Sequence, residues 1–263
     1  MKIRYRYCLV MLFLLCTLFG CSKKNENKEI EPELIIGGTS YSPYFYRDVN
    51  GNYAGIDVDI AKEVCKRIGY KPVFKEYDGD EEYLALKEGS VDCLWCCLSM
   101  DEESEDYKWV GPYLYTQRSV IVDADSEIET LEDLEGKRVA VQADSTSEEI
   151  ILNGTISTFP ELGQLTVFST IGEVFSALKK DYVDAAIGHE SALMVYAKDY
   201  LDEYRFLNMS LRSEALGIVF MKNAETVLVD AVEQEIQNMR NDGSLEKIVN
   251  EYGLNIQKNV YGD

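Results

Sequence analysis

The chain has little of what most enzymes use for chemistry. It contains a single histidine, His189, in 263 residues, and the CxxC pair of Cys93 and Cys96 has no second pair or nearby histidine to complete a metal site. Protein zinc sites take three or four such ligands, and a nucleophile needs a base within reach. We therefore expect no metal centre, no cofactor and no enzymatic activity.

Basic residues are also scarce. Lys and Arg total 26 against 47 Asp and Glu, which gives a formal charge of −21 at pH 7. Such acidity disfavours nucleic acid and anionic membrane surfaces as partners. The simplest interpretation is a solubilising surface, so charge alone does not name a ligand.

The N-terminus carries an apolar run, residues 8–19, after Lys2, Arg4 and Arg6. This run is too short to span a bilayer as a permanent helix, but it fits a secretory signal. The sequence LFGC, which ends at Cys21, resembles the lipobox of bacterial lipoproteins. We expect residues 1–20 to be a signal peptide and residues 21–33 to be a lipidated N-terminus and tether that anchors the protein outside the cytoplasm, on the cell membrane. The alternative is a plain secretory signal with an incidental cysteine.

Four cysteines follow: Cys65 in a helical pattern, and Cys93, Cys96 and Cys97 in the run VDCLWCCL. On a strand, Cys93 and Cys97 point to one face and Cys96 to the other, as small apolar core residues do. We expect them to be packed thiols, with disulfides as the open alternative. Trp95 on the same strand is expected in the core.

Residues 131–149 predict a strand, a loop and a helix start. The apolar run 139–141 is followed by Ser145 and Thr146 and then by Glu148 and Glu149, a pattern typical of a helix N-cap. In an open α/β sheet this junction lies at the carboxyl edge of the strand, where it can receive an anionic group of a ligand. An ordinary helix cap that touches no ligand is the alternative.

Apolar spacing predicts an α/β fold. Strand patterns at residues 34–36, 71–77 and 91–98 alternate with helical patterns at 60–68 and 82–87, which indicates a parallel sheet with helices on its faces. The later part predicts strands at 165–168, 183–187, 204–207 and 216–221. It predicts helices at 171–180, 191–200, 225–241 and 244–252.

A series of motifs runs along residues 34–253 in this order: YSPYF, GIDVDIAKEV, ALKEGSVD, SMDEE, GPYLY, LEDLEGKRVAVQADSTSEE, FSALKKDYVDAAIG, LGIVF and MRNDGSLEKIVNEYG. The set is similar to the polar amino-acid family of bacterial solute-binding proteins, the receptors of ABC importers. The resemblance implies two α/β lobes, each a mainly parallel sheet flanked by helices, joined by two crossing hinge strands near residues 113–122 and 212–217. Lobe one would then be residues 34–117 with 215–263, and lobe two residues 118–214.

The resemblance also implies a function. We expect a monomer that captures a small polar solute, an amino acid or a related compound, between its lobes and delivers it to an ABC permease in the membrane. Two alternatives stay open: a ligand sensor of the same fold that reports to a signalling partner, and a dehydratase-like enzyme, because fold does not fix function.

Several site residues carry over from the family pattern. Tyr41 matches the ring that stacks on the ligand, with Tyr44 beside it. Ser99 matches the hydroxyl residue that binds the ligand carboxylate. Ser145 and Thr146 match the hydroxyl residues of the helix start in lobe two.

The charged contacts do not carry over. Ser104 stands where the family has an arginine that grips the ligand carboxylate, and Gly79 stands where it has a second ring, with Tyr77 and Tyr83 nearby. His189, followed by Glu190, replaces the aspartate that binds the ligand ammonium.

We therefore consider Arg118, in the first crossing strand, as a replacement contact for an anionic group. A solvent-facing arginine at the hinge is the alternative. For His189 the alternatives are a ligand contact that titrates near neutral pH and a structural histidine.

Overall fold

The computed structural model describes residues 31–79, 81–100, 105–143, 145–154 and 156–262. The chain divides into Met1–Glu31 and Pro32–Asp263, and the helices and strands below belong to the second unit. The expected signal peptide, the expected lipidation residue Cys21, and Ser104 lie outside the described residues. Within the described part of the chain, no helix is long and apolar enough to cross a membrane.

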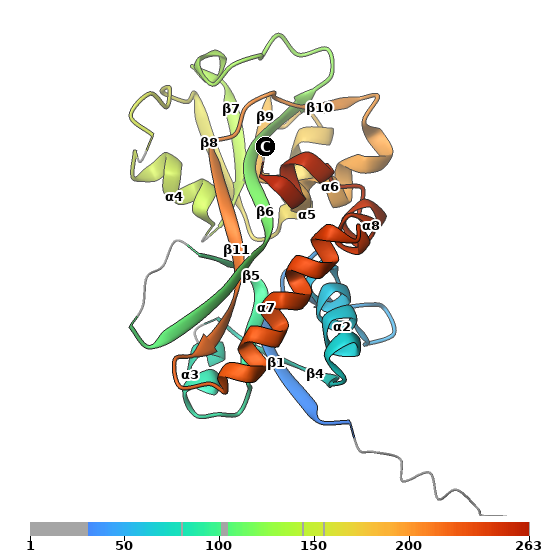
Figure 1. Cartoon of the computed structure of the whole chain (residues 1–263). Coiled ribbons are helices and arrows are strands. Elements are labelled where there is room, and N and C mark those ends of the chain that lie inside the picture. The colour runs from blue at the N-terminus through green and yellow to red at the C-terminus, as the bar shows by residue number, and fades with distance from the viewer. Residues whose placement is uncertain (1–30, 80, 101–104, 144, 155, 263) are drawn as a thin grey trace, which may run out of the picture. The chain divides into compact units, whose positions relative to one another are not determined.

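One mixed sheet runs through the described part of the chain in the order β4-β1-β5-β11-β6-β9-β7-β8, with β10 paired to β6 (Figure 1). β1 is parallel to β4 and β5, and β7 is parallel to β8 and β9, whereas β6 and β11 run antiparallel to their neighbours. The strands of this sheet are β1 (Glu33–Thr39), β4 (Lys71–Tyr77), β5 (Cys93–Ser99), β6 (Tyr107–Asp123), β7 (Arg138–Gln142), β8 (Gln164–Phe168), β9 (Ala185–His189), β10 (Tyr204–Phe206) and β11 (Arg212–Met221).

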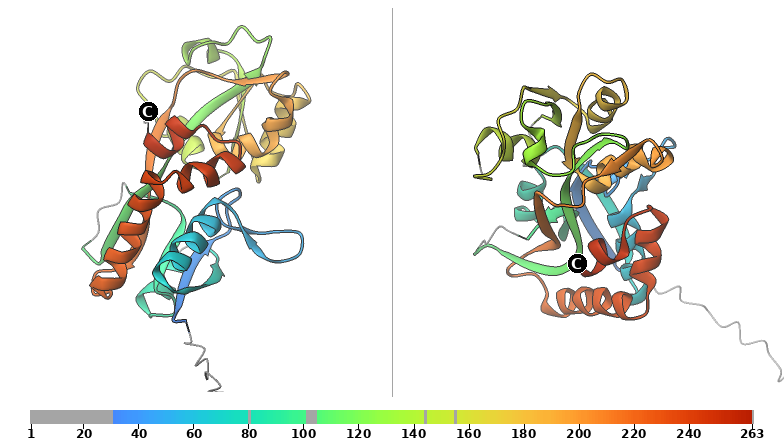
Figure 2. Two further views of the ribbon diagram at one scale, coloured as in Figure 1. Left: turned by 45° about the vertical axis from the view of Figure 1, so that its right-hand side comes forward. Right: turned by 90° about the horizontal axis from the view of Figure 1, so that it is seen from above.

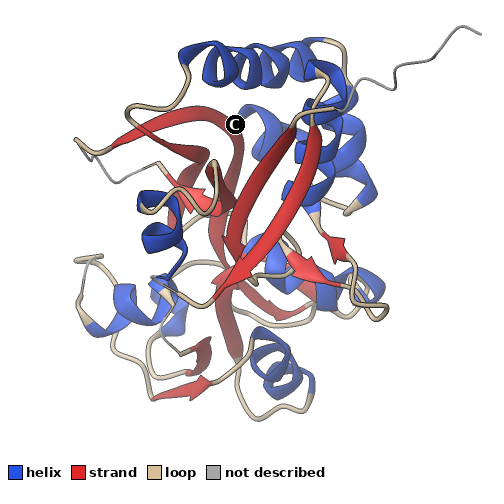
Figure 3. Cartoon of the chain, turned by 90° about the horizontal axis from the view of Figure 1, so that it is seen from below, coloured by secondary structure: helices blue, strands red, loops and turns tan. Residues whose placement is uncertain are grey.

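Helices flank this sheet, which confirms the predicted α/β class (Figure 3). A hairpin of β2 (Tyr46–Arg47) and β3 (Tyr53–Ala54) stands apart from the sheet. The helices are α2 (Ile56–Ile68), α3 (Glu81–Lys87), α4 (Thr146–Leu152), α5 (Ile171–Lys179), α6 (Glu190–Ala197), α7 (Thr226–Asn241) and α8 (Ser244–Glu251), with the short turns η1 (Glu132–Leu134), η2 (Lys198–Tyr200) and η3 (Gln257–Tyr261).

The buried side chains form two groups, as expected for two lobes. One group comes from residues 34–114 and 216–260, so it draws on both ends of the described chain. The other comes from residues 120–207. We call the elements around the first group lobe one and those around the second lobe two; the boundary residues given above stay a prediction.

Two long strands pass from one lobe to the other. β6 and β11 pair antiparallel from Arg118 opposite Arg212 to Tyr107 opposite Met221. The register shifts between Leu216 and Ile218, beside Pro112 of β6. Proline has no N–H to donate to the ladder, so an irregularity is where a strand interior tolerates it.

Helix α7 shows how the sequence pattern builds lobe one. The predicted apolar positions Val229, Val232, Ile236 and Met239 recur at helical spacing, and all four are buried. Each such side chain contributes about 1.5–3 kcal/mol when it leaves water. α7 packs beside α2, although the two helices lie far apart in the sequence (Figure 2).

Several strands differ from their predicted bounds, and the shift of β9 bears on the site. β9 is Ala185–His189 rather than 183–187, so His189 ends the strand instead of following it. Asp184 already pairs with β7, because its N–H donates to the Arg138 carbonyl at 2.8 Å. The strand extends to His189 because His189 pairs with Arg118 of β6.

Candidate functional site

Side chains of both lobes meet beside the crossing strands. The Tyr44 hydroxyl lies 2.7 Å from Ser191 Oγ, and Cys97 Sγ lies 3.7 Å from His189 Nε2. Thr116 of β6 lies between the lobes, with its hydroxyl 2.9 Å from His189 Nδ1. We call the following residues the crossing-strand cluster: Tyr41, Tyr44, Cys97, Thr116, Arg118, Thr146, His189, Ser191 and Glu214.

The loop after β1 holds the two predicted rings in this cluster. The first N–H groups of α2, from Ile56 and Asp57, donate to the carbonyls of Pro43 and Tyr44 at 2.9 and 3.0 Å. Gly55 permits this approach, because at its φ of 125° a Cβ would lie 2.1 Å from the Tyr44 carbonyl oxygen. The loop is thereby fastened to the N-terminus of a helix.

Both rings face His189. The Tyr41 and Tyr44 rings are parallel, with centroids 6.1 Å apart, and each meets the imidazole edge-on at 5.7 and 5.5 Å. Tyr44 is fully buried, and its hydroxyl also lies within 3.3 Å of the Thr116 hydroxyl. The structure therefore places both predicted tyrosines in the cluster, where the Tyr44 hydroxyl hydrogen-bonds to Ser191 and Thr116.

His189 is buried among neutral hydroxyls. Burial, aided by the positive charge of Arg118, holds its pKa well below the usual value of 6.5. Ser191 Oγ lies 2.9 Å from His189 Nδ1, so the ring is fixed by its neighbours. This environment favours the neutral imidazole of a structural histidine over a group that titrates near neutral pH.

Arg118 and Glu214 form the charged part of the cluster. Nη2 of Arg118 lies 3.2 Å from Glu214 Oε2 and also donates to Thr146 Oγ1 at 3.1 Å. The side chains of Arg118 and Glu214 are only 13% and 6% exposed. Arg118 Nε is buried and has no hydrogen-bond partner among the described residues. The side chain is thus turned inward, against the solvent-facing alternative, and its guanidinium keeps unused donor capacity.

Cys97 has a second contact besides the expected core packing. Cys65, Cys93 and Cys96 are buried free thiols, and Cys97 is partly buried and packs against the core of lobe one. Its thiol also reaches His189 in the cluster, which the strand pattern did not predict. The reason is its backbone, which has a φ of 59° rather than a strand value and so points the side chain differently. Trp95, in contrast, is buried as predicted.

Asp57 is the buried acid that supports this backbone. Its carboxylate accepts the Cys97 N–H at 2.7 Å and the Tyr113 hydroxyl at 2.9 Å. Burial raises the pKa of Asp57 to about 7. Sequence reasoning missed Asp57, although an acid between Ile56 and Val58 at an apolar helix start was a signal.

Three predicted site residues have other contacts. Ser145 caps α4, accepting from the Glu148 N–H at 3.3 Å and donating to the Gln142 carbonyl at 2.6 Å, as the ordinary-cap alternative holds. Glu190 accepts the Ser119 hydroxyl at 2.6 Å and pairs with Lys258 at 3.6 Å, on the other face of β6. Ser99 ends β5, opposite Leu216.

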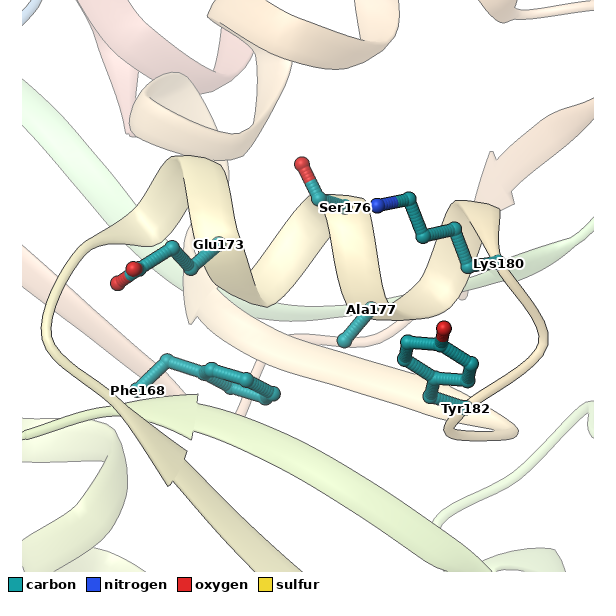
Figure 4. Close-up of a pocket in the computed structure, with 6 residues that line it drawn as sticks. All are labelled: Phe168, Glu173, Ser176, Ala177, Lys180 and Tyr182. Carbon is teal, nitrogen blue, oxygen red and sulfur yellow. The ribbon is translucent and has the colours of Figure 1, made fainter.

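Two surface cavities lie away from the cluster. One, of about 180 Å³, lies against α5, where Figure 4 shows the rings of Phe168 and Tyr182 on either side of Ala177. The other, of about 420 Å³, runs along α2 and α8 and is lined largely by Lys and Glu side chains. Neither contains a predicted site residue. Among the described residues, no group of three or more His, Cys, Asp or Glu side chains is placed to hold a metal ion.

Two lobes on one sheet, joined by two crossing strands with polar side chains from both lobes beside them, define a bilobal α/β binding protein. The chain belongs to the bacterial extracellular solute-binding proteins of family 3, whose family model matches residues 34–255. This match covers nearly all of the described chain.

Named relatives of this family resemble the whole chain. It is 31% identical over 249 residues to the arginine-binding extracellular protein ArtP of Bacillus subtilis, covering 91% of this chain and 95% of that protein. It is 29% identical over 244 residues to the histidine-binding periplasmic protein of Escherichia coli, covering 88% and 90%. Among solved structures, an ancestral cationic amino acid solute-binding protein matches with a TM-score of 0.75 at 25% identity, covering 84% of this chain and 95% of that one.

Proposed function

We propose that this protein is the receptor of an ABC importer for an amino acid or a closely related small polar solute. The observation that carries the proposal is the crossing-strand cluster, where Tyr44 and Cys97 of lobe one contact Ser191 and His189 of lobe two. A solute that contacts both lobes at this place favours their approach, and a ligand shifts a conformational equilibrium by its differential affinity for the two states. The relatives named for arginine and histidine binding support the ligand class.

Arg118 is the proposed contact for the solute carboxylate. It is a buried guanidinium with an unpartnered Nε, and it lies beside the start of α4 through Thr146. Glu214 is the matching contact for an ammonium group, because its carboxylate already balances Arg118 in the cluster. A zwitterion that enters this pair offers each charge a new partner. A lone anion leaves Glu214 with Arg212 alone, and a lone cation leaves the buried Arg118 without a carboxylate.

A thermal-shift screen tests the proposal. Among the described residues, the core lies between Leu34 and Val260, so a protein starting at Ser22 keeps this core. Unfolding and refolding removes carried solute, and a ligand that binds only the folded state raises the melting temperature by mass action. We expect a hit among amino acids. No hit among amino acids and closely related small polar solutes, or turnover of a bound compound, would contradict the proposal.

We further propose that Cys21 carries a lipid anchor and that the protein works outside the cytoplasm. The apolar segment with its LFGC ending supports the anchor, and the extracellular and periplasmic names of the relatives support the location. Fatty-acid labelling of cells should tag the wild type and fail on Cys21→Ala. Retention of Cys21→Ala on the membrane without label would contradict the anchor.

A further inference from the structure

We propose that Cys97 determines which solutes the site accepts, because its side chain limits the size of the uncharged part of the solute beside His189. This inference rests on the proposed function, since it concerns the same site. Three observations support it: the left-handed backbone of Cys97, the Asp57 carboxylate that binds the Cys97 N–H, and the contact of the Cys97 thiol with His189.

The backbone of Cys97 lies where side chains are disfavoured. Its φ of 59° is in the left-handed region, which among the described non-glycine residues it shares only with Asp181. In this region Cβ crowds the following carbonyl, so glycine is the residue usually found there. Such conformations persist only where the surroundings impose them, and they are frequent at ligand-binding sites.

An irregularity in strand pairing goes with this conformation. Gly217 of β11 pairs with Leu98 of β5, and Val219 pairs with Leu94. The segment of β5 between these pairs is therefore longer than the segment of β11. Extra residues in one strand bend it and re-aim a side chain. The two neighbouring thiols accordingly diverge: that of Cys96 lies 3.3 Å from Glu82 Oε2, inside lobe one, and that of Cys97 reaches His189 of lobe two.

Asp57 holds Cys97 in place. Its buried carboxylate accepts the Cys97 N–H at 2.7 Å and is itself fixed by the Tyr113 hydroxyl. A hydrogen bond to a carboxylate is stronger than one between neutral groups, so it can offset an unfavourable backbone conformation. Asp57 is therefore a positioning residue for the Cys97 thiol.

The thiol belongs to an uncharged wall of the site. Burial raises the pKa of Cys97 well above its usual value, and burial lowers that of His189, so both groups are neutral near pH 7. The rings of Tyr41 and Tyr44 complete this wall. Charge is concentrated on Arg118 and Glu214, where Arg118 Nε has no partner among the described residues.

This division separates two tasks. The charged groups of a solute bind at Arg118 and Glu214, and the remainder then lies against Cys97 and its neighbours. A glycine at position 97 would fit the backbone without strain and would leave the volume of Cβ and Sγ to the solute. Cysteine there shortens the longest side chain that the site accepts.

Calorimetric titration of the purified chain with a graded series tests the inference. The probes are alanine, 2-aminobutyrate, norvaline and norleucine, which differ by one methylene, and their ω-amide and ω-amino counterparts. In Cys97→Gly we expect the preferred length to increase by about one methylene and the affinity for the next longer member, relative to the wild-type optimum, to rise at least about tenfold. Cys96→Ala, on the opposite face of the same strand, should leave the ranking within twofold.

The outcomes separate the two proposals. Binding by the wild type with an unchanged ranking in Cys97→Gly would overturn the role of Cys97 and leave the proposed function standing. Failure of the wild type to bind any amino acid, in this series or in the thermal-shift screen, would overturn both. Since glycine adopts this backbone freely, Cys97→Gly should fold; Cys97→Ala, which keeps Cβ and loses the thiol, should shift the ranking in the same direction and less strongly.

Discussion

The two faces of β6 at the crossing differ in what they hold. On one face Thr116 and Arg118 join the crossing-strand cluster, where the contacts are buried and run between the lobes. On the other face Ser119 donates to Glu190, which pairs with Lys258, a residue that keeps 30% of its side-chain surface exposed. Successive strand residues point to opposite faces. A single strand thus separates a buried, proposed binding face from an outer face that supports the fold.

Polar residues near the hinge are therefore not equivalent. Glu190 follows His189 directly, and both were predicted to contact the solute. The structure places His189 with the cluster and Glu190 toward the C-terminal turn η3. The difference follows from their positions, because His189 ends a strand and Glu190 begins a helix.

Removing the charge on the inner face should have the largest effect. In Arg118→Met a carboxylate of the solute loses its cation and the buried Glu214 keeps only its ion pair with Arg212, so we expect affinity to fall by more than about 100-fold. Lys258→Met removes a charge of the same sign on the outer face and should change affinity less than twofold. Titration calorimetry of both variants gives the comparison; equal losses would remove the distinction between the faces.

Asp57 should make the folded chain less stable as pH rises, because its pKa is raised by burial. Burial raises the pKa of Asp57 from 3.8 to about 7, so the folded chain holds the proton more tightly than the unfolded chain. Its contribution to stability is complete below about pH 4 and is lost as pH rises through 7. Asp57→Asn does not titrate, so its unfolding free energy relative to the wild type should rise by roughly 2–4 kcal/mol between pH 4 and pH 8.

Urea unfolding of both proteins across this range measures the difference directly. The groups common to both chains cancel in the comparison, which isolates Asp57. A difference that does not change with pH would show that Asp57 is not a buried protonatable group.

His189 should make stability depend on pH in the opposite direction to Asp57, with a smaller change over the range tested. Because burial lowers its pKa, its contribution to stability is present above about pH 6.5 and is lost as pH falls below that value. The wild type should lose about 1–2 kcal/mol relative to His189→Gln from pH 7 to pH 5. In Asp57→Asn, which removes the other buried group that titrates in this range, solute affinity should stay within about twofold from pH 6 to pH 8. A steep change there would point to titration of His189.

The outer-face ion pair should contribute least. Lys258 and Glu190 are 3.6 Å apart and partly exposed, and pairs of this kind contribute less than about 1 kcal/mol. Lys258→Met should lower the melting temperature slightly, and the double variant with Glu190→Gln should add a further small loss, because Ser119 also bonds Glu190. A large loss in Lys258→Met would mean that the C-terminal turn fastens the lobes together.

The sequence predicted the fold well because local periodicity decides much of it. The apolar spacing in α7 and the buried run around Trp95 depend only on which side chains leave water, and both are found as predicted. The cluster was predicted in part. Tyr41, Tyr44, Arg118 and His189 were predicted as site residues, and the structure places all four in the cluster. Their ligand contacts stay a prediction.

What the sequence did not reveal depends on pairing between distant segments. The left-handed backbone of Cys97 follows from an irregular register with β11 and from a carboxylate in α2. The partner of Arg118 is Glu214, almost a hundred residues further along the chain, on the second crossing strand. No local pattern reports such cross-strand neighbours, so Glu214 appeared only with the structure. The acid at the apolar start of α2 marked Asp57 as unusual, but its partner Cys97 could not be read from the sequence.

The decisive measurement is a crystal structure of the chain bound to the amino acid that gives the largest rise in melting temperature. We expect the solute beside the crossing strands, with a carboxylate oxygen within hydrogen-bonding distance of Arg118 and with the solute touching Tyr41 and Cys97. A solute bound in the cavity between Phe168 and Tyr182, or anywhere else away from the crossing-strand cluster, would contradict it.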